Sequence, residues 1–339
     1  MRAFSLLDLA PITAGSTPRQ ALLNARDLAC HAEALGYQRY WMAEHHNSTG
    51  IASAATAVAL GYVAEGTSRI RIGAAGIMLP NHSPLVIAEQ FGTLASLYPD
   101  RVDLGLGRAP GTDGKTAHAL RRDNLRADER FPQDVQELQA YFHDGCNGIK
   151  AVPGHGLQVP LWILGSSLFG AQLAAQLGLP YLFASHFAPD ALDQALAVYR
   201  RNYQPSTAHP LPYAGAAINV FAADTDEEGA RLQRGTIQGF ILLRRGQAGP
   251  LQPPVDRLSD IALPHEIAMA EHVLCESAVG APPAVEAFIE RFLARTGVDE
   301  LVLTCHAWDH AARKRSFALV APVLQRLIRP RRVCVSLNG

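Results

Sequence analysis

The chain has 339 residues, of which 48% are hydrophobic and 18% are charged, and its formal net charge is −1. This composition can bury a large core and excludes intrinsic disorder, while the balanced charge argues against partners such as nucleic acid or an anionic membrane surface. The length suits one α/β barrel with insertions and does not require a second domain.

Strands and helices are predicted to alternate along the chain. After a first strand at 2–9, Thr17 and Pro18 are expected to begin a helix, with Thr17 as its N-cap and Pro18 at the first helical position. Further strands are predicted at 37–43, 69–74, 101–106, 161–164, 181–184, 214–222 and 301–304. Helices are predicted at about 52–65, 83–97, 128–143, 189–203 and 308–328, with another from 168. Eight short apolar strands alternating with helices favour a closed (β/α)8 TIM barrel over an open sheet.

Residues 1–328 are expected to form a single domain, followed by a solvated tail at 329–339. Residues 245–280 are rich in proline and do not fit the alternation, so we expect an insertion between the seventh and eighth strands, with a short helix after Pro264. A long ordered insertion can be a lid or a substrate wall, or a plain surface excursion.

Features of the chain that bear on localisation favour the cytoplasm. The N-terminal segment is interrupted too early for a signal peptide, and no apolar run approaches the roughly 20 residues that cross a bilayer. Five scattered cysteines fit reduced thiols better than a disulfide framework or a zinc site. We therefore expect a cytoplasmic protein that has no contact with membranes.

Catalytic groups of a barrel lie at the carboxyl ends of its strands. Small residues and two hydroxyls follow the fifth strand at Gly165, Ser166 and Ser167, where a helix N-terminus would favour an anion such as phosphate. An ordinary serine N-cap is the alternative. Arg108, after the fourth strand, is a candidate second phosphate ligand, or else a partner of Asp103 or Asp113 in an ion pair.

Two histidines follow the second strand. Neighbours on an extended chain face opposite sides, so one of His45 and His46 is expected to enter the barrel mouth, as a proton donor or hydrogen-bond anchor. Glu44 with these two histidines and no third site is a weak metal set, and no metal is predicted. His306 and His310 are spaced to share one helix face and are interpreted as structural.

Taken together, these motifs resemble those of the bacterial luciferase-like flavin-dependent monooxygenases. The matching pieces lie at 40–46, 72–84, 89–90 and 103–113, and the likeness is close over 1–200 and thins over 205–298. The resemblance implies a barrel that binds FMN at its carboxyl-terminal mouth. It also implies that His45 is the catalytic histidine and that Ala74–Ala75 is a non-proline cis peptide under the flavin ring. By the same resemblance, Arg108 and the turn at Gly165, Ser166 and Ser167 bind the FMN phosphate.

The chemistry implied by the resemblance is that of the oxygenase component of a two-component system. A separate NAD(P)H:flavin reductase would supply reduced FMN, and one oxygen atom of O2 would enter an organic small molecule by hydroxylation, epoxidation or Baeyer–Villiger insertion, for example in secondary-metabolite tailoring. Ser185 stands where luciferases carry a flavin-contacting Trp, which argues against aldehyde-dependent light emission. A homodimer is a further expectation from the resemblance.

Two alternatives keep the barrel. The first is a hydride-transfer oxidoreductase that uses the deazaflavin coenzyme, whose longer anionic tail should need more cations than Arg108, Arg121 and Arg122 provide. The second is a flavin-binding protein without catalysis. The presence of His45 argues against this alternative.

Overall fold

A closed barrel of eight parallel strands forms the centre of the protein, in a computed structural model that describes residues 1–109, 111–120 and 129–328. The strands follow the order β1–β2–β3–β4–β5–β6–β7–β9, and the pairings of β6 with β7 and of β9 with β1 close the ring. They are β1 (Ala3–Asp8), β2 (Arg39–Met42), β3 (Arg71–Met78), β4 (Val102–Gly107), β5 (Leu161–Gly165), β6 (Tyr181–Phe183), β7 (Ala214–Ala222) and β9 (Glu300–Thr304). The predicted (β/α)8 barrel is confirmed.

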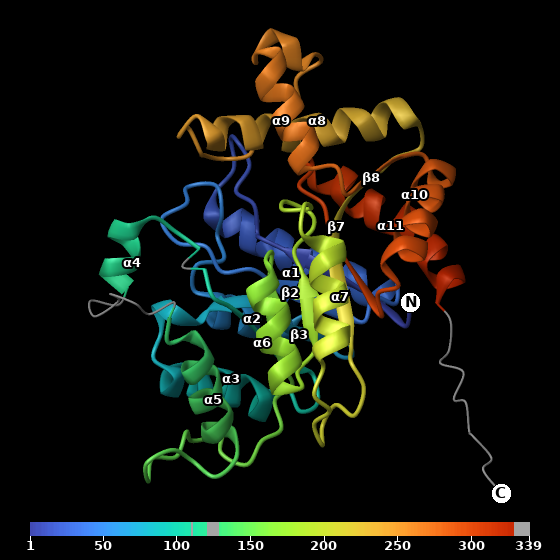
Figure 1. The fold of residues 1–339 in the computed structure, drawn as a ribbon. Helices are drawn as coiled ribbons and strands as arrows, with labels where there is room; N and C mark the ends of the chain where they lie inside the picture. Colours follow the sequence, from blue (N-terminus) through green and yellow to red (C-terminus); the bar gives the residue numbers. More distant parts are fainter. Residues whose placement is uncertain (110, 121–128, 329–339) are drawn as a thin grey trace, which may run out of the picture.

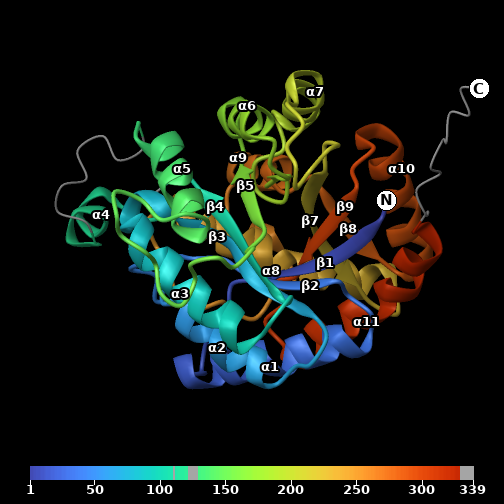
Figure 2. The ribbon, with the colours of Figure 1, turned by 90° about the horizontal axis from the view of Figure 1, so that it is seen from below.

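Helices surround this ring of strands (Figure 1), and the view in Figure 2 shows the strands in the centre with helices outside them. The longer helices are α1 (Pro18–Ala34), α2 (Thr56–Glu65), α3 (Pro84–Leu97), α5 (Phe131–Phe142), α6 (Leu168–Leu177), α7 (Leu192–Asn202), α8 (Asp226–Arg244), α10 (Pro282–Thr296) and α11 (His310–Leu327). Their apolar faces and the outward-facing strand residues form one large buried core between the two rings.

Local sequence signals set the ends of several helices. Thr17 caps α1 as predicted, because its Oγ1 accepts a hydrogen bond from the backbone N–H of Gln20 at 3.2 Å, and Pro18 occupies the first turn. Helix α6 ends at Gly178, whose φ of 62° is in the left-handed region that glycine adopts without strain. These ends fix where the loops after the strands begin.

The amino-terminal end of the barrel is filled by charged and aromatic side chains. Arg39 forms ion pairs with Asp103 at 2.6 Å and Glu300 at 3.0 Å, and both carboxylates are fully buried. Its guanidinium lies 5.6 Å from the ring centroid of Trp41 and 5.2 Å from that of Trp162. The barrel is therefore a packed core at this end, and space for a ligand has to be sought at the other.

The insertion between the seventh and eighth barrel strands carries more structure than the sequence indicated. Besides the predicted short helix after Pro264, which is α9 (Pro264–Val273), it contains the 3-10 turn η2 (Leu258–Asp260) and an unpredicted strand, β8 (Ser277–Gly280), which pairs with the distal half of β7. Leu251 exchanges backbone hydrogen bonds with the loop after β1, at Ile12 and Ala14. The insertion thus packs over the carboxyl-terminal side of the barrel, and Figure 1 shows α8 and α9 together at that end.

Two further differences concern short segments. Helix α4 (Gly114–Leu120), and the turn η1 (Leu79–Asn81) after β3, were not predicted. No helix among the described residues is both long and apolar enough to cross a membrane. Arg121, Arg122 and the predicted tail at 329–339 lie outside the described residues, and the assignment of 1–328 to one domain stays a prediction.

Candidate functional site

His45 lies in the loop that leaves β2 at the carboxyl-terminal end of the barrel. Its Nδ1 is buried and has no hydrogen-bond partner among the described residues. Burial lowers the pKa of the imidazole, and Glu44 beside it only partly opposes that effect. His45 is therefore neutral at pH 7, with one ring nitrogen able to donate a proton and the other able to accept one.

Two more imidazoles gather at this end of the barrel, at His186 after β6 and at His306 after β9. Burial lowers the pKa of His186 to about 3, and His306 and His45 lower it further because their charges would repel its own. Burial likewise lowers the pKa of His306 to about 4. The Nδ1 of His186 and the hydroxyl of Thr304, at the end of β9, are buried without partners in the described structure. Unpaired buried polar groups of this kind indicate a site that a ligand completes.

His306 and His310 lie in different surroundings, although their spacing suggested one shared helix face. His310 is the first residue of α11, and its Nε2 lies 2.8 Å from a carboxylate oxygen of Asp27 in α1, on the outside of the barrel. His306 precedes the helix, so the two do not share a helix face. Its position directly after the last strand was the signal that could have placed it at the mouth. In the loop after β6, Ser185 is fully buried and its hydroxyl donates a hydrogen bond to the carbonyl of Ala217. His186 is therefore the residue of this loop whose side chain is available at the barrel mouth.

The second histidine of the β2 loop, His46, pairs with a carboxylate. The Nε2 of His46 lies 2.7 Å from Oε1 of Glu44, and the Nε2 of His82, from the loop after β3, lies 2.8 Å from the same oxygen. Glu44 is 1% exposed. Burial would raise its pKa, but the hydrogen bonds and charges of the two histidines lower that pKa to about 2. From the sequence, Glu44 is grouped with His45 and His46, whereas in the structure His82, from another loop, joins Glu44 and His46.

Arg108 and the Ser166–Ser167 turn come together as predicted. The guanidinium of Arg108, after β4, lies 4.1 Å from the ring centroid of Phe169 in the first turn of α6, and β4 pairs with β5. Asp103 is instead bound by Arg39 and Arg71, and Asp113 by Asn47 and Thr116, so neither forms the alternative ion pair with Arg108.

The alternative that a serine here is an ordinary N-cap agrees with the structure in position but not in hydrogen bonding. Ser167 is the N-cap residue of α6, but its side chain accepts no hydrogen bond from the helix. Ser166 and Ser167 are exposed, and Gly165 immediately precedes them at the end of β5. An arginine fork, two hydroxyls and a helix N-terminus therefore lie at one corner of the barrel mouth, an arrangement suited to binding a phosphate.

The cis peptide bond lies one residue later than predicted, at Ala75–Gly76 rather than Ala74–Ala75. The bond lies within the stretch where the pairing of β3 with β4 shifts its register, between Ala74 and Ile77. Ala74 is fully buried in the outer core, whereas Ala75 packs with the residues inside the barrel. Ala74 and Ala75 were both predicted to contact the flavin ring, and only Ala75 faces the barrel interior.

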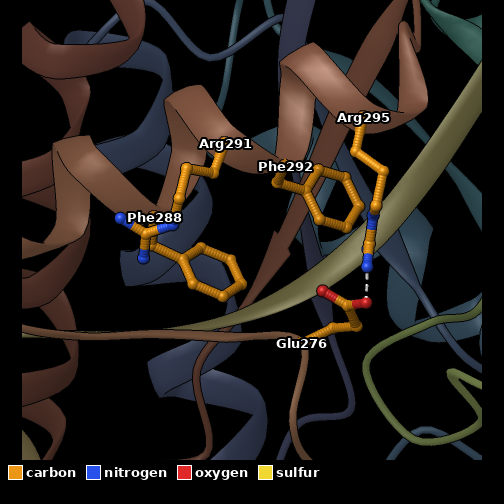
Figure 3. A pocket seen from close by; sticks show the side chains of 5 residues that line it. All are labelled: Glu276, Phe288, Arg291, Phe292 and Arg295. Atoms are coloured by element: carbon orange, nitrogen blue, oxygen red, sulfur yellow. Dashed lines mark hydrogen bonds and ion pairs between the residues drawn. The ribbon is translucent and has the colours of Figure 1, made fainter.

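A pocket of about 170 Å³ lies elsewhere, beside α10, and Figure 3 shows the residues that line it: Glu276, Phe288, Arg291, Phe292 and Arg295. Arg295 forms an ion pair with Glu276 across this pocket. None of the residues predicted to bind a flavin lines it, and it is separate from the candidate site at the barrel mouth.

Many TIM-barrel enzymes that hold a phosphorylated cofactor or substrate bind it at the carboxyl-terminal mouth, where this barrel has an imidazole and an arginine beside a helix N-terminus. Comparison with known sequences is more specific. The family described as luciferase-like monooxygenase matches residues 3–297, and the chain belongs to this family of oxidoreductases.

Relatives cover nearly the whole chain. A luciferase-like monooxygenase of Escherichia coli strain K12 is 50% identical over 328 residues, which are 96% of this chain and 98% of the relative. The N-acetyl-S-alkylcysteine monooxygenase of Bacillus subtilis is 31% identical over 280 residues, covering 79% of this chain and 82% of the relative.

Among solved structures, apo-MsnO8 has a TM-score of 0.85 and 31% identity, covering 98% of this chain and all of that one. The same fold occurs at lower identity in the FMN complex of the oxygenating constituent of 3,6-diketocamphane monooxygenase from Pseudomonas putida, with a TM-score of 0.72, 18% identity, and 98% and 100% coverage. It also occurs in an F420-dependent secondary alcohol dehydrogenase, with a TM-score of 0.64, 15% identity, and 97% and 100% coverage.

Proposed function

We propose that the protein is an FMN-dependent monooxygenase, the oxygenase component of a two-component system whose separate NAD(P)H:flavin reductase supplies reduced FMN. The overall reaction takes an organic small molecule, O2 and reduced FMN to the oxygenated product, water and oxidised FMN. The observation that carries the proposal is the presence of the Arg108–Ser166–Ser167 corner and of His45 at the same end of one barrel.

The residues at the mouth suit FMN in charge. The guanidinium of Arg108 and the first turn of α6 suit the phosphate. Inside the mouth, Ala75 packs with the side chains of the barrel interior, on the side where the ring of a bound flavin would lie. The unpartnered Nδ1 atoms of His45 and His186 are available to the polar edge of a bound ring or to a substrate.

Bound reduced FMN would supply the two electrons that activate O2. The role proposed for the chain is to orient the reactants, exclude water and control protons. His45, neutral at pH 7 because burial lowers its pKa, would hold a proton on one ring nitrogen and deliver it where oxygen is reduced. The insertion that packs over the mouth would limit the access of water.

One alternative is hydride transfer with the deazaflavin coenzyme, which the fold shared with an F420-dependent dehydrogenase keeps open. A longer anionic tail would call for more cations than Arg108 at this corner. The other alternative is a flavin-binding protein without catalysis. The neutral His45, whose Nδ1 has no partner among the described residues, argues against it.

A homodimer is part of the proposal, with helices α2 and α3 as the contact. Both helices expose large apolar side chains, Val58 (76%) and Tyr62 (36%) on α2 and Val86 (42%) and Leu97 (65%) on α3. Size-exclusion chromatography with light scattering should give twice the chain mass, and Val58→Glu should shift the protein toward the monomer. A monomeric wild type would contradict this contact.

The test of the function is direct. The purified protein is first titrated with FMN and with the deazaflavin coenzyme. Its complex with reduced FMN is then mixed with 18O2 and a panel of small thioethers, ketones and aromatics. Mass spectrometry of the products detects the labelled oxygen. We expect one labelled oxygen atom in a product. His45→Asn should bind FMN within about twofold of the wild type and lose about 100-fold or more of the product formation. Tight binding of the deazaflavin coenzyme with no affinity for FMN would refute the proposal.

A further inference from the structure

Glu44, His46 and His82 form a cluster that the proposed flavin chemistry does not use. Glu44 and His46 belong to the loop after β2, and His82 follows η1 in the loop after β3. One ligand atom from each residue, the carboxylate Oε1 and two imidazole Nε2 atoms, lies within 4.8 Å of the others. The loops after two adjacent strands, β2 and β3, thus bring three donor atoms close together.

The donor set matches what zinc-type divalent ions bind. Two imidazole nitrogens and one carboxylate oxygen are common ligands of Zn²⁺, and such sites can leave a position open for water. Bonds of about 2.0–2.2 Å in a tetrahedral site place ligand atoms about 3.4 Å apart. The two nitrogens lie 2.7 and 2.8 Å from Oε1, so small side-chain movements of well under 1 Å would open the cluster to an ion.

The surroundings suit a cation. Glu44 is only 1% exposed, so its carboxylate faces a bound ion in a place poorly screened by water. His46 and His82 are 13% and 24% exposed in their side chains, which gives an ion access from solvent. A small pocket of about 90 Å³, lined by Glu44, His82 and Gln90 among others, adjoins the cluster and has room for a water ligand.

From these observations we propose that Glu44, His46 and His82 form a binding site for a divalent transition-metal ion of the zinc type, with water completing the coordination. In the metal-free protein the two imidazoles hydrogen-bond to the carboxylate in place of the ion. An imidazole nitrogen has to be free of its proton to bind the ion, so protons compete with the metal. The ion would tie the loop that carries His45 to the loop after β3. The proposal does not depend on flavin binding.

The test uses the full chain, stripped of metal with a chelator and titrated by calorimetry with ZnCl2 at pH 7.5. We expect one ion per chain with a Kd of about 10 μM or tighter, and Co²⁺ in its place should give visible d–d absorption. His46→Asn and His82→Asn should each weaken binding at least about tenfold. His272→Asn, which breaks the exposed pair with Asp190 at 2.9 Å, is the matched control and should leave the Kd unchanged.

Far-UV circular dichroism establishes that each variant is folded. Independently of the variants, anomalous diffraction at the zinc edge from wild-type crystals grown with Zn²⁺ should give a peak between the three side chains. No saturable binding to the wild type, an unchanged Kd in both histidine variants, or a zinc peak elsewhere would each overturn the proposal.

Discussion

Replacing Arg108 by Ala should weaken FMN binding without weakening riboflavin binding. A guanidinium that forms charge-assisted hydrogen bonds to a phosphate contributes about 1.5–3 kcal/mol, so the Kd for FMN should rise about 10- to 150-fold. Riboflavin has no phosphate, and its Kd should change less than about twofold. Quenching of flavin fluorescence measures both constants on the same preparation.

Two further variants separate the charge of Arg108 from its packing. Phe169→Leu removes the ring that lies 4.1 Å from the guanidinium, and the loss of a cation–π contact of about 0.5–1 kcal/mol should raise the Kd for FMN about two- to fivefold. Arg108→Lys keeps the charge but not the planar fork and should lie between Ala and the wild type. If Arg108→Ala weakened FMN and riboflavin equally, or left FMN binding intact, the phosphate role of this corner would be wrong.

Three other predictions concern stability. Burial lowers the pKa of His186 to about 3 in the folded protein. At pH values near and below 6.5 this residue therefore binds more protons in the unfolded chain than in the folded one. The free energy of unfolding should fall as the pH drops from 6.5 to 5, by at most about 2 kcal/mol for this residue. Urea titrations should show a flatter pH dependence in His186→Asn, and an unchanged slope would contradict the assignment. Arg313→Met leaves Asp8 buried without its partner at 2.5 Å and should cost about 3–5 kcal/mol by urea unfolding; a cost below about 1 kcal/mol would show that the pair is dispensable. Gly105→Ala puts a Cβ 2.4 Å from the Ala74 carbonyl oxygen and should cost about 1–3 kcal/mol, whereas an unchanged melting temperature would show that the strand can move.

The barrel was predictable because its strands are short apolar runs with clear punctuation. Thr17 with Pro18 marks a helix start in the sequence itself, and the structure places the cap there. Strand β8 was missed because its four residues, Ser277–Gly280, carry no apolar run, and only the pairing with the distal half of β7 makes them a strand. Tertiary pairing outweighs local propensity at such positions.

The candidate site was predictable only in part. Arg108 and the Ser166–Ser167 turn could be brought together by reasoning, because they follow adjacent strands. The partnership of Glu44 with His82 could not be read from spacing, since 38 positions separate them and the loop after β3 had to be placed first. The cis bond at Ala75–Gly76 lies where the pairing between β3 and β4 shifts its register, and periodicity reveals neither feature.

The packed amino-terminal end of the barrel also constrains the order of events. Within the described residues, Arg39, Trp41, Trp162 and Glu300 fill that end, so molecules that react inside enter and leave through the same opening. Whatever binds deepest must arrive first and depart last. Steady-state kinetics of such an enzyme should follow a compulsory sequence, and an excess of the later-binding reactant should trap the earlier one inside.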